Sequence, residues 1–245
     1  KGVELNAAGE LVIDHIKKQK AEIGALKSRL ADLQGTRAGH VKIACSQGLG
    51  NYFIPTEIAK YRNDFKQVTF EVLLMDHSEA HEAVSKHEVD FALTFEIKKS
   101  HEIDIIIAVE QNMHAVMKKN HPLAKFKEIR LVECMEYPIV LPLSQFAGRQ
   151  LVEKALLKKS LAPKPVLQSN SFNVLFSYLD QEEAITFQIP LGIENNHPSS
   201  NLTSCMISKK DLESSYIYLV QKRGRVPSVA TARFVNQLLQ TLSKN

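Results

Sequence analysis

The sequence predicts an α/β fold in which parallel strands alternate with helices. Three segments support this prediction, namely 41–65, 137–156 and 166–179. Each begins with a short apolar run, breaks at small polar residues, and continues with apolar residues at helical spacing. Strands and helices that alternate at this pace indicate parallel sheets with right-handed crossovers. The segments share this plan but little sequence, so we expect two α/β lobes rather than a sequence repeat.

The composition narrows the classes of protein. The chain has 245 residues, 44% hydrophobic and 24% charged, with a net charge of +4, which is typical of one large or two small globular domains. Its basic residues are scattered apart from 222–225, so they do not indicate a nucleic-acid groove. The sequence shows neither a long apolar span nor an apolar leader. Cys45, Cys134 and Cys205 are far apart, which favours a reducing, cytoplasmic location.

A long helix is predicted over 6–34, with Asn6 as its N-cap and Gly35 as its stop. Its apolar residues step by three and four, with one polar position at Gln19. They are Val12, Ile16, Ile23, Leu26, Leu30 and Leu33. Because this seam is narrow and the other faces are charged, we favour a dimerising helix. The alternative is a helix that packs on its own domain.

The first lobe is predicted from alternating strands and helices. Its strands are expected at 41–45, 68–74 and 91–95, and its helices at 54–65 and 79–87.

The second half continues with the same kinds of element. Strands are expected at 103–109, 113–117, 137–141, 166–168, 184–189 and 216–220, and helices at 151–156, 174–179 and 229–242. The polar segment 192–203 is predicted to be a turn-rich loop.

The turns that join strands to helices are the candidate binding sites. In such a turn, free backbone N–H groups and the positive end of the helix dipole face the region beyond the strand. The candidates for binding a small polar or anionic ligand are Ser46, Gln47, Gly48, Thr94, Phe95, Ser144, Gln145 and Ser169. For the serines, the alternative is an ordinary helix N-cap.

Neither a metal site nor an active site is predicted. His77 and His81 have a metal-like spacing, but the sequence offers no third ligand besides the nearby Glu79, so surface histidines are the simpler interpretation. The motifs of serine hydrolases, zinc proteases, P-loop enzymes and dinucleotide-binding enzymes are absent. We therefore expect no cofactor and no enzymatic activity.

Five strings, in order along the chain, resemble the LysR-type transcriptional regulators. Leu5–Leu11 resembles the entry to the family's linker helix, and Gly39–Ala44 resembles the start of its effector domain. The others are Ile54-Pro55 with Phe65, Val89–Leu93, and Asn120–Ala124, which contains the family's His-Pro-Leu loop.

Two positions depart from the family pattern. Glu182–Ile185 stand where a Gly-Leu-Gly is usual, and Asp76-His77 replace a glycine after the second strand. Both positions lie near the expected ligand cleft, so the resemblance leaves the class of effector open.

The resemblance implies a type 2 periplasmic-binding-protein fold, with two Rossmann-like lobes after a linker helix. The implied domains are a linker helix at 1–38, lobe I at 39–110 and 213–245, and lobe II at 111–212.

The implied function is the effector-binding and oligomerisation part of a DNA-binding regulator. The implied partners are a small-molecule effector between the lobes, a homodimer or homotetramer formed through the linker helix and lobes, promoter DNA, and RNA polymerase. The DNA-binding domain is expected before Lys1, and no membrane contact is expected. The alternatives are a transporter's solute-binding protein and an enzyme on the same two-lobed fold.

Overall fold

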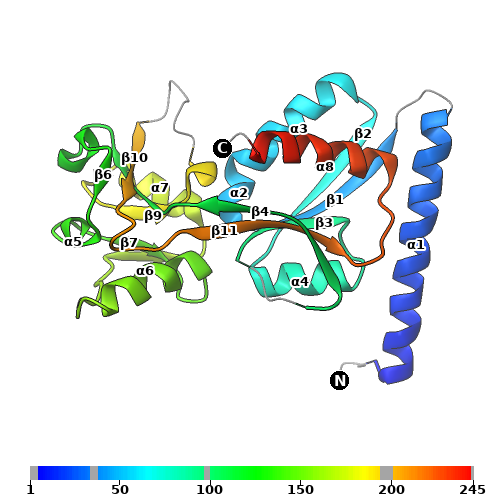
Figure 1. The fold of residues 1–245 in the computed structure, drawn as a ribbon, viewed down its shortest axis with the longest axis horizontal. Coiled ribbons are helices and arrows are strands. Elements are labelled where there is room, and N and C mark those ends of the chain that lie inside the picture. The colour runs from blue at the N-terminus through cyan, green and yellow to red at the C-terminus, as the bar shows by residue number, and fades with distance from the viewer. Residues whose placement is uncertain (1–4, 34–37, 97–99, 194–200, 244–245) are drawn as a thin grey trace. The chain divides into compact units, whose positions relative to one another are not determined.

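The structure is a computed structural model that describes residues 5–33, 38–96, 100–193 and 201–243. Contacts divide the chain into two compact units. The first unit comprises 1–45, 56–108 and 218–245, and the second comprises 46–55 and 109–217. Each unit contains its own strands and helices, which confirms the α/β prediction (Figure 1).

The first unit is built on a five-stranded sheet with the order β2-β1-β3-β11-β4. Its strands are β1 Gly39–Cys45, β2 Val68–Leu74, β3 Phe91–Phe95, β4 Ile103–Gln111 and β11 Ser215–Lys222. β1 pairs in parallel with both β2 and β3, as the alternation of strands and helices predicts. The helices that follow these strands are α3 Phe53–Asp64, α4 His77–Ser85 and α8 Val229–Leu242.

An aromatic cluster holds α3 and α8 against this sheet. The ring of Phe234 lies 5.3 Å from that of Tyr61 and 5.0 Å from that of Phe70, both at steep interplanar angles. Such edge-to-face packing adds to the stabilisation from burial. The predicted apolar stripes of the two helices therefore face one shared core.

The second unit contains a four-stranded sheet with the order β6-β10-β5-β9 and a smaller sheet of β7 and β8. Its strands are β5 His114–Lys118, β6 Glu128–Ile129, β7 Val140–Pro142, β8 Leu167–Ser169, β9 Thr186–Gln188 and β10 Leu202–Ile207. Its helices are α2 Gln47–Asn51, α5 Leu131–Cys134, α6 Ala147–Leu157 and α7 Phe172–Leu179, with short 3-10 helices η1 Pro122–Lys125 and η2 Pro190–Gly192.

Some predicted boundaries were wrong. The segment 192–203 was expected to be a loop, but β10 begins at Leu202 and pairs antiparallel with β5. The strand expected at 137–141 is shorter and later, because a turn after α5 occupies its first residues. For β10 the pairing partner, rather than local hydrophobicity, decides where the strand forms.

The N-terminal helix, α1 Ala7–Leu33, uses two of its faces differently. The Asn6 side chain accepts a hydrogen bond from Gly9 N at 2.8 Å, which confirms the N-cap. The small residues Ala21, Ala25 and Ser28 are among its more buried positions, and Ser28 lies against Gly39 of β1.

The apolar heptad seam of α1 faces solvent. Val12, Ile16, Ile23, Leu26 and Leu30 are 49–57% exposed, and Leu33 is 85% exposed. The helix therefore packs on its own unit through small residues and leaves its large apolar residues exposed. Within the described ranges, none of the helices is both long enough and apolar enough to cross a membrane.

Candidate functional site

Three strands of the second unit end at one edge. β7 and β8 are parallel, and Pro142 pairs with Ser169. A parallel bridge between Ile139 and Ile185 sets the start of β9 beside β7. Because parallel strands point the same way, the residues after each strand meet at the same edge. We call this the strand-end edge and define it by residues 142–145, 169–171 and 188.

The short helix α2 lies at the strand-end edge. Gln47 Oε1 accepts a hydrogen bond of 3.4 Å from the backbone N–H of Phe172, at the start of α7. Gly48 packs directly on Gln188, because a Cβ atom at position 48 would lie 2.5 Å from Gln188 Nε2. The structure therefore brings Gln47 and Gly48 together with the ends of β8 and β9.

Ser46 precedes α2 and does not cap it with its side chain. Its backbone is extended, and its carbonyl accepts from Leu49 and Gly50, but its hydroxyl makes no capping hydrogen bond. The N-cap alternative predicted from sequence therefore does not account for this hydroxyl. Ser46 is half-buried, so the hydroxyl is available to another partner.

Ser144, Gln145 and Ser169 also lie at the strand-end edge. Ser144 and Gln145 are exposed in the turn after β7, and Phe146, not Ser144, is the N-cap of α6. Ser169 Oγ accepts from Ser171 N at 3.0 Å, so this hydroxyl shapes its own turn. Ser144 and Gln145 are therefore exposed for ligand contact, whereas the Ser169 hydroxyl is already engaged.

Thr94 and Phe95 belong to the first unit instead. Thr94 is 1% exposed, and its hydroxyl donates to the carbonyl of Glu96 at 3.0 Å. Glu96 has a positive φ of 63°, a conformation that a residue with a side chain rarely adopts. The Thr94 hydroxyl therefore stabilises the turn after β3, while six of the eight predicted site residues lie in the second unit.

Sequence reasoning missed Arg149, which lies behind the strand-end edge. It is 9% exposed, and its guanidinium donates to the carbonyl of Pro142 at 2.7 Å and to the side chain of Gln168. Its Nε atom also donates to Glu153 Oε1 at 2.8 Å. This buried guanidinium joins the ends of β7 and β8, and its charge is paired with Glu153.

Gln188 was also missed, and it carries an unused donor. Its Oε1 atom accepts from Ile189 N at 2.9 Å, but its buried Nε2 has no partner among the described residues. A buried polar atom without a partner is uncommon and needs an explanation. The neighbouring Thr186 hydroxyl is also buried and has no partner among the described residues. The edge therefore has buried polar groups without a partner in the described part of the chain, which suits a polar ligand.

Other chemistry receives little support. Within the described ranges, His, Cys, Asp and Glu side chains form no group of three that could hold a metal ion. The three cysteines are free and buried, and burial raises the pKa of Cys45 and of Cys134 to about 12. At neutral pH these two thiols stay protonated and are poor nucleophiles.

Comparison with known proteins gives consistent results. A family model described as the LysR substrate binding domain matches residues 34–243. The HTH-type transcriptional regulator CysB of Burkholderia cenocepacia is 24% identical over 177 residues, which cover 72% of this chain and 56% of CysB. The chain spans about half the length of this and other curated relatives.

Two solved structures confirm the fold class. The effector binding domain of QuiR in complex with shikimate has a TM-score of 0.66 at 17% identity, covering 85% of this chain and 99% of QuiR's. The regulatory domain of CcmR from Synechocystis PCC6803 in complex with 2-PG has a TM-score of 0.68 at 15% identity, covering 83% and 97%. Both support the two-lobed fold expected from the sequence.

Proposed function

We propose that this chain, which belongs to the LysR substrate binding domain family, is the effector-binding and oligomerisation part of a LysR-type transcriptional regulator. The family is one of transcriptional regulators, which are not enzymes. This favours regulation over both the transporter and the enzyme alternatives.

The proposed effector is a small polar or anionic metabolite that binds at the strand-end edge. The observation that carries this proposal is the presence of polar groups at the edge that have no protein partner within the described ranges. The Ser46 hydroxyl caps nothing, Gln188 Nε2 is unpaired, and the Arg149 guanidinium lies behind the turn that carries Ser144. Shikimate in QuiR and 2-PG in CcmR are the first compounds to test. Ligand contact by Thr94 and Phe95, and the domain boundaries 39–110 with 213–245 and 111–212, remain predictions.

A thermal-shift screen of the chain with small carboxylic and phosphorylated acids tests this proposal. A ligand that binds only the folded state raises the melting temperature with its concentration. Calorimetry on a ligand found in this way should show roughly tenfold weaker binding for Ser46→Ala and for Ser144→Ala, since each loses one hydrogen bond to the ligand.

The matched control is Ser177→Ala, which removes an exposed hydroxyl from α7, away from its start. Its affinity should equal that of the unmodified chain. Unchanged binding by both Ser46→Ala and Ser144→Ala, with folding intact, would remove the site assignment.

Self-association is proposed to use the seam of α1. Leu26 is 57% exposed on that seam, and Leu157 is 65% exposed on α6. Leu26→Lys should therefore lower the sedimentation mass of the chain, while Leu157→Lys serves as the control for an added charge on an exposed leucine. Equal masses for the unmodified chain and Leu26→Lys would contradict a seam dimer. The same measurement distinguishes a dimer from a tetramer.

The remaining partners follow from the proposed class. Promoter DNA would bind through a helix-turn-helix domain before Lys1. RNA polymerase would be a further partner, and the regulator would act in the cytoplasm. The three free cysteines support a reducing compartment. Reading the coding sequence upstream of Lys1 tests this part of the proposal, because a helix-turn-helix pattern is expected there.

A further inference from the structure

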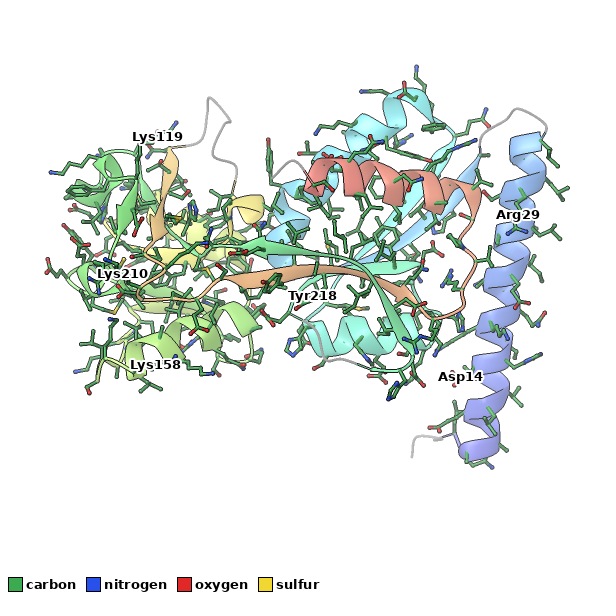
Figure 2. All side chains as sticks on the ribbon, in the orientation of Figure 1. Asp14, Arg29, Lys119, Lys158, Lys210 and Tyr218 are labelled. Carbon is green, nitrogen blue, oxygen red and sulfur yellow. The ribbon has the colours of Figure 1, made fainter. Side chains whose placement is uncertain are left out.

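A second pocket lies in the second unit, away from the strand-end edge. It has a volume of about 240 Å³ and lies where the last turns of α6 meet the turn after β10. Five lysines line it, namely Lys154, Lys158, Lys159, Lys209 and Lys210. Figure 2 labels Lys158 at the end of α6 and Lys210 in the turn. We call it the lysine pocket.

Asp211 organises one side of the lysine pocket. Its carboxylate is fully buried and accepts hydrogen bonds from Arg130 Nε at 2.9 Å, Arg130 Nη2 at 2.7 Å and Leu131 N at 2.7 Å. It also pairs with Lys159 Nζ at 2.9 Å. With two cations beside it, Asp211 has no capacity left to neutralise the other lysines.

Most of the remaining charge in the lysine pocket is unpaired. Lys209 pairs with Glu110 at 3.1 Å, and both side chains are at least half exposed. Among the described residues, Lys154, Lys158 and Lys210 have no carboxylate within ion-pairing distance. Glu213 is the one lining carboxylate besides Asp211. A net positive charge therefore remains around a small concave space, where the field of like charges adds up.

The stability of α6 does not explain this arrangement. Cations near the C-terminus of a helix interact favourably with its dipole, which accounts for Lys154 and for Lys158, the C-cap. It does not account for Lys209 and Lys210, which come from a different element and meet the same pocket. Bringing them there adds repulsion that a bound anion would relieve.

We infer that the lysine pocket binds a small anion that carries two or more negative charges close together, such as pyrophosphate. Lysine ammonium groups are well suited to phosphate oxygens as point charges. The volume is below the roughly 300–1,000 Å³ of sites for drug-sized ligands, so the occupant is small.

The pocket and the strand-end edge lie at opposite ends of α6. Ala147 begins this helix beside the turn that carries Ser144, and Lys158 caps its other end. The pocket is lined from Leu151 onward, and none of the residues that define the strand-end edge lines it. A small anion in the lysine pocket therefore does not occupy the proposed effector site, and the two sites are testable separately.

Calorimetric titration of the full chain with pyrophosphate, at low and constant ionic strength, tests the inference. We expect saturable binding that weakens at least tenfold in Lys158→Gln/Lys210→Gln. The control is Lys119→Gln/Lys127→Gln, which removes two exposed lysines of the same unit outside the pocket. The control pair should change the affinity less than twofold. All substitutions are at exposed positions, and circular dichroism verifies that each variant is folded.

Three results would overturn the inference. The first is the absence of saturable binding to the unmodified chain. The second is equal weakening by the two lysine pairs, which would show a general effect of net charge. The third is a tenfold loss in Ser46→Ala/Ser144→Ala with no loss in the lysine-pocket pair, which would place pyrophosphate at the strand-end edge.

Discussion

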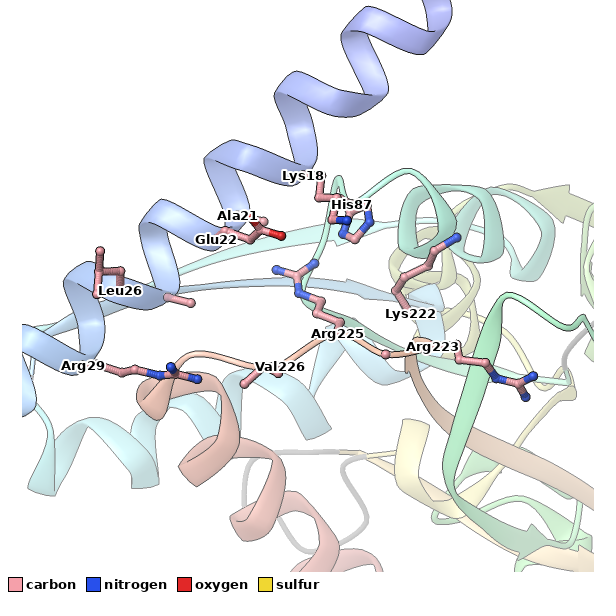
Figure 3. A pocket seen from close by; sticks show the side chains of 12 residues that line it. Lys18, Ala21, Glu22, Leu26, Arg29, His87, Lys222, Arg223, Arg225 and Val226 are labelled. Atoms are coloured by element: carbon pink, nitrogen blue, oxygen red, sulfur yellow. The ribbon is translucent and has the colours of Figure 1, made fainter.

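The lysine pocket and a cavity in the first unit have equal numbers of cationic side chains and use them differently. The cavity in the first unit has about 420 Å³ and lies between α1 and the turn after β11 (Figure 3). Its five lysine and arginine side chains are Lys18, Arg29, Lys222, Arg223 and Arg225. We call it the helix cavity. It is larger than the lysine pocket, yet its cations are mostly engaged in ion pairs.

The pairing in the helix cavity serves the fold. Arg225 donates to the carbonyl of Val89 at 2.7 Å and to the carboxylate of Asp90, whose other oxygen accepts from Lys42 N at 2.8 Å. Arg223 and Lys222 pair with acids of the neighbouring β4 region, and in Figure 3 Arg223 points away from α1. Three of the five cations in the helix cavity are therefore paired with acids of the fold, whereas three of the five in the lysine pocket have no such partner among the described residues.

The largest expected effect is on Asp211, which supports the lysine pocket. Asp211→Asn should lower the free energy of unfolding by about 3 kcal/mol at pH 7, because it leaves Arg130 and Lys159 without their shared carboxylate. Urea denaturation measures this change. Glu213→Gln, at an exposed residue of the same pocket, should change it by less than about 0.5 kcal/mol.

The effect of Asp211→Asn should also depend on pH. The hydrogen bonds from Arg130 are the main cause that holds the pKa of Asp211 well below its usual value of 3.8. A lowered carboxyl pKa contributes stability above the unfolded-state value, and this contribution is lost as the pH falls toward the folded-state value. The difference between the two proteins should therefore shrink between pH 5 and pH 2. A constant difference would contradict this electrostatic account.

A smaller loss of stability is expected for a substitution beside the helix cavity. Asp90→Asn should lower the free energy of unfolding by about 1.5 kcal/mol, because it weakens a partly buried pair with Arg225 but keeps an oxygen that can accept from Lys42 N. Asp104→Asn breaks the exposed pair with Arg223 and should cost less than about 0.5 kcal/mol. Equal losses in urea denaturation would remove the structural role of the Arg225 pair.

The helix cavity should contribute little to anion binding. Lys18→Gln/Arg29→Gln removes two cations of the helix cavity and should change the affinity of the chain for pyrophosphate less than twofold. The same titration as for the lysine pocket measures this. A tenfold loss would reverse the comparison and make the helix cavity the anion site.

The smallest effect concerns His87, which lines the helix cavity. Burial, followed by the charges of Arg225, Lys222 and Lys18, lowers the pKa of His87, while Asp14 acts in the opposite direction. Lys18→Gln should therefore raise the pKa of His87 slightly in an NMR titration. Lys20→Gln, at an exposed position of α1 outside the cavity, should leave it unchanged.

Local patterns predict much of the fold. The helix expected at 229–242 is α8 with the same bounds, and the strand expected at 91–95 is β3. The helix has clear periodicity, and the strand is a short apolar run between Asp90 and Glu96. β10 has neither, because Thr203 and Ser204 interrupt its apolar residues and its antiparallel partner β5 is distant in the chain. Pairing of that kind leaves no local signal.

The residues of the candidate site were likewise predicted only where a local pattern marks them. Ser46, Ser144 and Ser169 were found because each stands at or shortly after the end of a strand. Arg149 was not, because an arginine inside an amphipathic helix normally indicates the solvent face, and only the folded chain places it under Pro142. Gln188 was not found either, because nothing near it in the sequence indicates that Gly48 and Gly192 pack against its side chain.

Those two glycines have a consequence for how this sequence can change. Gln188 lies so close to Gly48 and Gly192 that a methyl group at either position would displace its amide, at 2.5 Å and 2.7 Å respectively. A shorter residue at 188 would remove both obstacles at once. Substitutions at these three positions should therefore show strong epistasis, and related sequences with a smaller residue at 188 are the ones expected to have lost the glycines.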